Sequence, residues 1–228
     1  MENQMKLSNE TIEVLRNFGA IQPNIVVNPG STISTLAEAK HILAEAQIEQ
    51  TFDTEFGIYD VNEFLSAHSL IEDPELEFLD SHVTLKSGTA SVKYHFADRE
   101  ILTKKTKDIN MPPSDMTFDF TDESIQAIRR ASSSLSLDSP SLSLSVDNGK
   151  VVAKVLCSQN PSSNSYSLEV GDYSGAENGS DYRFNIENLK LIGGDYEVNI
   201  TNKLISNWKH KTKNVQYWIA LDKSTNIA

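Results

Sequence analysis

The chain has 228 residues, of which 32 are acidic and 20 are basic, so its formal net charge is −12 at pH 7. This acidity argues against a protein that grips nucleic acid by bulk attraction, because phosphate binding depends on clustered Lys and Arg; solubility alone explains it. The single cysteine, Cys157, excludes an internal disulfide and a thiolate metal cluster.

A short amphipathic stretch occurs twice in the chain. Residues 7–17 and residues 120–130 match position by position at a constant offset of 113 residues. A hydroxyl side chain, Ser8 or Thr121, stands where a helix N-cap is expected, and an acidic residue follows two places later, where it suits the positive end of the helix dipole. Both stretches are therefore predicted to begin helices, and the duplication favours two domains of about 110 residues each.

Each repeated helix has an apolar face and a polar face. In the first copy Ile12 and Leu15 share the apolar face, whereas Arg16 lies on the opposite side. The second copy places Arg129 at the equivalent position, with Arg130 beside it on the polar face. We expect one stripe of each helix to face a core and one arginine of each helix to face outward.

The rest of the first half is predicted to form strands around a second helix. Residues 42–50 are ambiguous by composition, since their Ala, Glu and Leu favour a helix while their alternation favours a strand; a hairpin with residues 31–36 decides for the strand. Asp60 is placed to cap a helix that runs to His68, with Glu63 three residues after the cap as in a capping box. A meander is then predicted over residues 74–78, 83–86 and 90–96.

Residues 103–115 form the best linker candidate. They are charged, carry two prolines and show neither the period of a helix nor that of a strand. The predicted boundaries are residues 1–108 for the N-terminal domain, 109–116 for the connector and 117–228 for the C-terminal domain.

The second half repeats the order of the first. After a helix over residues 121–131, Leu and Ser alternate through residues 132–145, which predicts an amphipathic strand with its hydroxyls outward. Asp147-Asn148-Gly149 between two apolar runs indicates a hairpin turn. Asn185 is placed to cap a short helix over residues 186–191. The fold class is therefore predicted to be α+β, in two similar domains.

No motif for catalysis or metal binding is present in the sequence. The five histidines are scattered without paired spacing, no serine sits in a Gly-x-Ser-x-Gly elbow, and no glycine run has the P-loop or dinucleotide pattern. His68 is interpreted as a partly buried helix residue and not as a ligand. We expect a protein that is not an enzyme and needs no cofactor or metal.

Several short motifs follow one another in a recognisable order. Those of the first half are Met5-Lys6-Leu7-Ser8, Asn17-Phe18, Thr32-Ile33-Ser34-Thr35, Ala44-Glu45-Ala46 and Ile58-Tyr59-Asp60-Val61-Asn62-Glu63-Phe64-Leu65, and those of the second half are Asn148-Gly149-Lys150-Val151-Val152, Leu168-Glu169-Val170-Gly171-Asp172-Tyr173, Phe184-Asn185-Ile186, Leu189-Lys190-Leu191 and Gly194-Asp195-Tyr196. Their order resembles that of the sliding clamps of T4-type bacteriophages, which are DNA polymerase processivity factors. The resemblance spans nearly the whole chain from Met5, and residues 80–115 match least.

The resemblance implies two similar DNA-clamp domains, each with antiparallel sheets outside and two helices facing the hole of a ring. Three subunits would join head to tail into a homotrimer around double-stranded DNA, without sequence specificity. Arg16, Arg129 and Lys190 match basic positions of the family and would face the DNA. Arg130 joins them on its helical face alone. The basic loop Lys209 to Lys213 would either touch DNA at the rim or form an exposed hairpin.

The resemblance also implies protein partners. These are the phage DNA polymerase, the clamp loader ATPase and the late-transcription proteins, of which some would insert a hydrophobic peptide into a pocket near the domain boundary. Ile109, Met111, Pro112 and Pro113 are candidates for the wall of that pocket. No leader opens the chain and no apolar run reaches the ~18 residues that cross a bilayer, so we expect the cytoplasm of the infected bacterial host.

Two other readings stay open from the residues alone. A β-rich phage structural or assembly protein could use a duplicated domain to build rings with no DNA role. An acidic hydrolase would need carboxylates gathered in a cleft, and pairs such as Asp53 with Glu55, or Asp181 with Glu187, could be aligned into one. Basic residues at equivalent places on the repeated helices favour the clamp, because an assembly protein has no need of them.

Overall fold

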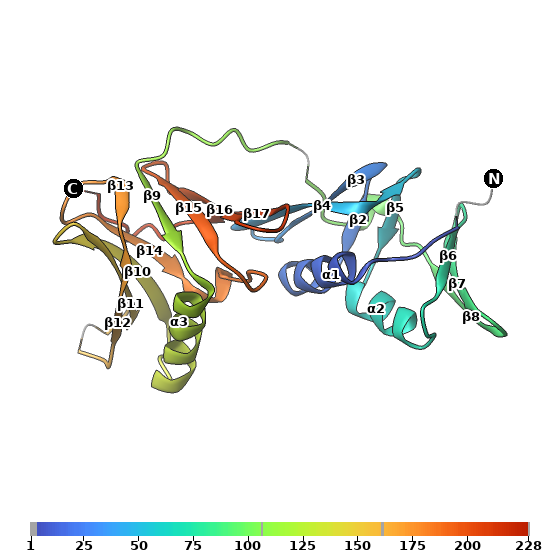
Figure 1. The fold of residues 1–228 in the computed structure, drawn as a ribbon, viewed down its shortest axis with the longest axis horizontal. Coiled ribbons are helices and arrows are strands. Elements are labelled where there is room, and N and C mark those ends of the chain that lie inside the picture. The colour runs from blue at the N-terminus through green and yellow to red at the C-terminus, as the bar shows by residue number, and fades with distance from the viewer. Residues whose placement is uncertain (1–3, 106, 161, 228) are drawn as a thin grey trace. The chain divides into compact units, whose positions relative to one another are not determined.

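The computed structural model in Figure 1 describes residues 4–105, 107–160 and 162–227. The chain divides into two compact units, Met1–Lys107 and Asp108–Ala228. Each unit combines antiparallel β-sheets with helices, so the predicted α+β class is confirmed. None of the described helices is long and apolar enough to cross a membrane.

The first unit packs two helices against its strands. Helix α1 (Asn9–Ile21) and helix α2 (Val61–Ser69) lie against each other, and α1 also packs on β3 (Gly30–Leu36) and β4 (Ile42–Phe52). The remaining strands are β1 (Gln4–Met5), β2 (Ile25–Val27), β5 (Phe56–Ile58), β6 (Glu75–Phe78), β7 (His82–Ser87) and β8 (Ala90–His95), with a 3-10 turn η1 (Arg99–Ile101).

Residues 42–52 form a strand, as predicted. β4 pairs antiparallel with β3, and its apolar residues Ala44, Ala46 and Ile48 are buried while Gln47 and Glu49 are exposed. The alternation therefore decided the structure against the helical propensity of the same letters. The predicted meander is also confirmed, since β6, β7 and β8 pair in order in a sheet completed by β1.

The described residues of the second unit form two sheets and one α-helix. One sheet has the order β12-β11-β10-β14, and in the other the order is β13-β9-β15-β16-β17. Helix α3 (Asp122–Leu135) packs on β11 and β12. The strands are β9 (Met116–Phe120), β10 (Pro140–Asp147), β11 (Lys150–Cys157), β12 (Tyr166–Gly171), β13 (Tyr173–Gly175), β14 (Asp181–Asn185), β15 (Tyr196–Thr201), β16 (Ile205–His210) and β17 (Val215–Ala220), with a 3-10 turn η2 (Ile186–Asn188).

The predicted hairpin turn at residues 147–149 is confirmed between β10 and β11. Asn148 and Gly149 both have positive φ, 49° and 80°, as a two-residue turn of type I′ requires. The turn residues thus follow directly from local backbone preference.

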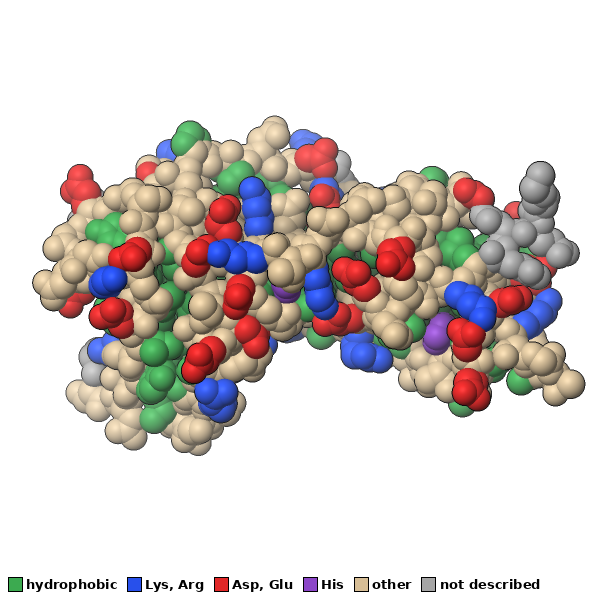
Figure 2. Space-filling view, in the orientation of Figure 1, with side chains coloured by type: hydrophobic (Ala, Val, Ile, Leu, Met, Phe, Trp, Pro, Cys, Tyr) green, Lys and Arg blue, Asp and Glu red, His purple; other side chains and the backbone are tan. Residues whose placement is uncertain are grey.

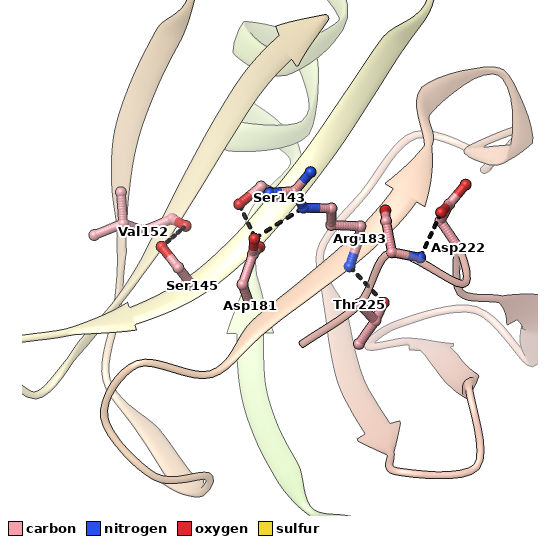
Figure 3. A network of polar contacts seen from close by, with 8 residues as sticks. Ser143, Ser145, Val152, Asp181, Arg183, Asp222 and Thr225 are labelled. Carbon is pink, nitrogen blue, oxygen red and sulfur yellow. Dashed lines mark hydrogen bonds and ion pairs between the residues drawn. The ribbon is translucent and has the colours of Figure 1, made fainter. Parts of the chain in front are cut away.

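The Leu/Ser-rich stretch differs from its prediction. Residues 132–135 extend α3, and Ser136 ends the helix in the left-handed conformation. In β10 the hydroxyls do not all face outward, because Ser141 and Ser143 are only 7% and 5% exposed. The hydroxyl of Ser143 is satisfied within the unit, since Ser143 Oγ donates to Asp181 Oδ1 at 2.6 Å on the neighbouring strand (Figure 3).

The same network holds the C-terminal segment against β14. Arg183 pairs with Asp181 at 2.8 Å, while its backbone N–H donates to Thr225 Oγ1 at 3.0 Å (Figure 3). Asp181 and Asn226 exchange two backbone hydrogen bonds of 2.7 and 2.9 Å. The outer edge of β14 is therefore covered by residues of the same unit.

The predicted helix over residues 186–191 is not an α-helix. Asn185 does act as a cap, since its side chain accepts from Glu187 N, but only Ile186–Asn188 form a 3-10 turn. Leu189, Leu191 and Ile192, which follow this turn without helix or strand, are all buried.

Candidate nucleic-acid interface

Helix α1 presents Arg16 to solvent. Ser8 caps the helix by accepting from Thr11 N at 3.2 Å, and the buried residues Val14, Leu15 and Phe18 fix which face points inward. Arg16 lies on the opposite face and is exposed. Among the described residues its guanidinium has no ion-pair or hydrogen-bond partner, so it can bind an external anion without breaking a contact.

Helix α3 repeats this arrangement only in part. Thr121 caps it by accepting from Ser124 N at 3.2 Å, and Ile125 and Ile128 are buried, as in the first copy. Arg130 is exposed. Arg129, however, is half-buried, and its Nη2 donates to the backbone carbonyls of two residues of one loop, at 2.8 Å to Leu189 and 3.1 Å to Leu191.

The expectation that equivalent arginines of the two helices both face outward is therefore corrected. Arg16 is exposed and Arg129 is engaged with the backbone of its own unit. Lys190, the third family-matched position, lies between the two carbonyls that Arg129 binds, and its side chain is exposed. Sequence reasoning missed the role of Arg129 because its partners lie 60 and 62 residues away.

The basic loop after β16 is organised by a histidine. His210 is buried, and its Nδ1 accepts from the backbone N–H groups of Thr212 and Lys213, both at 3.1 Å. Because these neighbours are donors, Nδ1 is the unprotonated nitrogen and Nε2 donates to Gly193 O at 3.0 Å. The turn after β16 is thus held by hydrogen bonds of His210. From the sequence alone, His210 was only one of five scattered histidines, within a basic run.

The surface of the protein carries charges of both signs. Figure 2 shows Lys and Arg side chains interspersed with Asp and Glu side chains on the face that it draws. Lys211 of the basic loop pairs with Asp119 at 2.5 Å. Within the described residues no group of three or more His, Cys, Asp or Glu is placed to hold a metal ion.

The four candidate residues for a peptide pocket lie in a stretch without helix or strand. Ile109, Met111 and Pro112 are half-exposed and Pro113 is exposed. Their apolar side chains are thus accessible to a partner, whereas strand β9 begins only at Met116.

Comparisons with known proteins identify the family. Two family models match the chain in succession, "DNA polymerase processivity factor" over residues 7–111 and "gp45 sliding clamp, C terminal" over residues 117–223. The sliding clamp of Vibrio phage KVP40 is 30% identical over 224 residues, which cover 96% of this chain and 99% of that protein. The sliding clamp of Enterobacteria phage T4 is 30% identical over 199 residues, covering 85% and 86%.

A solved structure shares the fold at low sequence identity. The proliferating cell nuclear antigen (PCNA) of A. fulgidus aligns with a TM-score of 0.71 at 15% identity, over 98% of this chain and 99% of that one. These matches do not support a structural or assembly protein, and they confirm the resemblance drawn from the motif order. The chain therefore belongs to the sliding-clamp family of T4-type bacteriophages, whose members are DNA polymerase processivity factors.

Proposed function

We propose that this clamp forms a closed homotrimeric ring that encircles duplex DNA, slides along it and tethers the phage replicative polymerase. The observation that carries the proposal is the end-to-end match with phage sliding clamps, through both units and in order. The protein has no catalytic role in this proposal, and it acts in the cytoplasm of the infected host, where phage DNA is replicated.

Encirclement reconciles DNA retention with a net charge of −12. A closed ring leaves DNA only when an interface opens or an end is reached, so tight contact is unnecessary. A protein with six to ten phosphate contacts loses about 10³ to 10⁵ in affinity between 50 and 200 mM salt, and such contacts would also resist sliding. A few exposed cations per subunit keep the ring centred and mobile.

The DNA-facing set that we propose for direct contact is Arg16, Arg130 and Lys190. All three side chains are exposed. Arg129 is not in this set, because its guanidinium is already bound to two carbonyls. The basic loop from Lys209 to Lys213 is left out of the set, since Lys211 is paired with Asp119.

We propose that the ring closes by pairing of two open sheet edges. β8 ends one sheet of the first unit, and β12 ends one sheet of the second. The opposite edge of the second sheet, β14, is covered by the C-terminal segment. Because β8 and β12 belong to different units of one chain, their pairing between copies is head to tail, which is the contact type that generates rings.

The backbone of both edges is oriented for this pairing. Phe96 N donates to Ser81 O, so in the β7–β8 pair the N–H groups of Ser91, Lys93 and His95 point away from β7. By the same alternation, counted from the bond between Ser158 N and Ser139 O, the N–H groups of Ser167 and Glu169 point away from β11. These five residues are all exposed, and unpaired edges of this kind are templates for another strand.

Tethering supplies the processivity. Linking the polymerase to a ring on the same DNA makes rebinding intramolecular, with effective concentrations up to about millimolar for short links. We propose that Ile109, Met111, Pro112 and Pro113 contribute to the wall of a pocket for a hydrophobic peptide of the polymerase, and that the clamp loader and late-transcription proteins compete for the same surface. The loader supplies ATP hydrolysis, since this chain has no P-loop motif.

A linearisation experiment tests encirclement. Labelled clamp is loaded onto nicked circular DNA by the phage clamp loader with ATP, separated from free protein at 300 mM salt, and the DNA is then cut once with a restriction enzyme. We expect the clamp to stay on the circle and to leave within minutes of the cut. Blocking both new ends with bound protein should restore retention. A clamp that remains on unblocked linear DNA would overturn the proposal, as would one that never survives the salt step.

A further inference from the structure

The two units differ where a second helix is expected. In the first unit α2 spans nine residues, and an α-helix of that length satisfies its interior carbonyls with its own N–H groups. In the second unit η2 has only three residues, and the chain continues through Leu189–Asp195 without helix or strand. Leu189, Leu191 and Ile192 are buried, so the polar groups of this backbone need partners from elsewhere.

Side chains from other elements supply those partners. Tyr196 Oη donates to Ile192 O at 2.7 Å, and Ile192 N donates to Tyr217 Oη at 3.2 Å. Asp122 Oδ1, at the start of α3, accepts from Gly194 N at 2.9 Å. The carbonyls on either side of Lys190, those of Leu189 and Leu191, are both bound by Arg129 Nη2. The loop over Leu189–Asp195 is therefore fastened to α3 near both of its ends, by Arg129 and by Asp122.

Arg129 donates hydrogen bonds to backbone carbonyls of this loop, as backbone N–H groups do within α2. Its two bonds are charge-assisted, and charge-assisted bonds are roughly twice as strong as neutral ones. If Arg129 turned outward to bind a phosphate, it would leave the two carbonyls without this donor in a loop whose leucines are buried. Arg16 occupies the equivalent place in the repeat, but its guanidinium binds no carbonyl of the residues that the structure describes.

We propose that Arg129 is a positioning residue of the DNA-facing surface. It holds the backbone on both sides of Lys190 and so fixes where that ammonium is presented, while Arg130 and Lys190 make the phosphate contacts of the second unit. The inference rests on the proposed function for its DNA part only; the fastening of the loop stands on the contacts within the unit.

Two measurements test the proposal on the full-length clamp. Arg129→Met keeps the length of the side chain and removes the donors, and Arg130→Met, one residue away and exposed, is the matched control. In hydrogen exchange followed by NMR, we expect the Ile192 and Gly194 amides to exchange at least tenfold faster in Arg129→Met, and at the wild-type rate in Arg130→Met. Unchanged exchange in Arg129→Met would overturn the fastening role. If that variant does not fold, Arg129→Gln provides a milder change at the same site.

A double-mutant cycle separates positioning from contact. Retention of loaded clamp on circular DNA is measured against salt for Lys190→Gln alone and combined with each arginine variant. We expect the double variant of Lys190→Gln with Arg129→Met to retain DNA as well as Lys190→Gln alone does. Adding Arg130→Met to Lys190→Gln should instead multiply the loss of retention. Multiplied losses for Arg129→Met would make Arg129 an independent phosphate contact and overturn the proposal. If Arg16→Gln, Arg130→Met and Lys190→Gln all retain DNA as wild type does, the proposed DNA surface is wrong, while the exchange result still decides the fastening role.

Discussion

At the scale of single residues, equivalent positions in a repeat are not equivalent in environment. Arg16 and Arg129 stand at the same place on two helices that are both capped by a hydroxyl side chain, yet one is exposed and the other donates to two carbonyls. The difference arises outside the helices, in the loop that replaces a second helix in one unit. A cation matched by position is therefore assigned a DNA role only after its neighbours are known.

His68 illustrates how burial couples one residue to pH. It lies half-buried in the last turn of α2, and this burial lowers the pKa of the imidazole below its usual 6.5, with the Asp73 carboxylate opposing in part. The unfolded chain therefore binds a proton on His68 more readily than the folded one. Its contribution to stability is complete above pH 6.5 and is lost as the pH falls through the window below that value.

We predict that His68→Gln flattens the pH dependence of stability. Between pH 7 and pH 5 the urea midpoint of the wild type should fall more steeply than that of the variant, because the variant no longer takes up this proton on unfolding. Parallel curves for the wild type and His68→Gln would show that burial of this ring has no effect on proton binding.

At the scale of elements, the helix starts are set by local chemistry. Ser8 and Thr121 each accept from the backbone N–H three residues on, and Asp60 accepts from Asn62 and Glu63 at 2.8 and 3.2 Å. Each bond satisfies an N–H that has no partner within its helix. This is why all three starts were predicted correctly from the sequence.

We predict that Thr121→Ala lowers the free energy of unfolding by about 1 kcal/mol, the usual effect of losing an N-cap. Thr121→Ser keeps the accepting oxygen, and serine ranks above threonine as an N-cap, so this variant should lose less stability than Thr121→Ala. Denaturant unfolding measures both, followed through the fluorescence of Trp208 and Trp218, which are buried in the same unit. Equal losses for the two variants would indicate that the methyl group and not the cap stabilises the start of α3.

At the scale of the whole molecule, the proposed ring depends on two sheet edges that stay open in the single chain. Lys93 offers a direct test because its N–H points away from β7, so that losing it breaks no bond of the sheet. Proline is tolerated on an edge strand for that reason, and it cannot donate to an added strand.

We predict that Lys93→Pro abolishes the trimer and leaves the monomer folded. Sedimentation at micromolar concentration should give a mass near three chains for the wild type and near one chain for the variant, with matching circular dichroism spectra. Lys93→Ala, which keeps the N–H, should remain trimeric. A trimeric Lys93→Pro would exclude β8 from the joint, and a monomeric wild type would exclude the stable trimer itself.

The sequence by itself determined the features that depend on near neighbours and on periodicity. Capped helix starts, the alternating strand β4, the turn at Asn148-Gly149 and the repeat were all visible there, because caps, turns and alternation are local or one-dimensional properties. The order of the motifs was enough to indicate the family. The sequence also showed which basic residues, Arg16, Arg129 and Lys190, stand at the basic positions of the family.

Only the tertiary structure decided which polar groups are exposed. Residues 186–191 carry a valid cap yet do not form an α-helix, and the carbonyls of Leu189 and Ile192 are bound instead by the side chains of Arg129 and Tyr196. Ser143 faces Asp181 across a strand pair instead of facing solvent, and Arg129 binds a loop that lies 60 residues further along the chain. The physical reason is the same in each case: burial and hydrogen-bond partners are set by segments distant in sequence, and no local pattern records them.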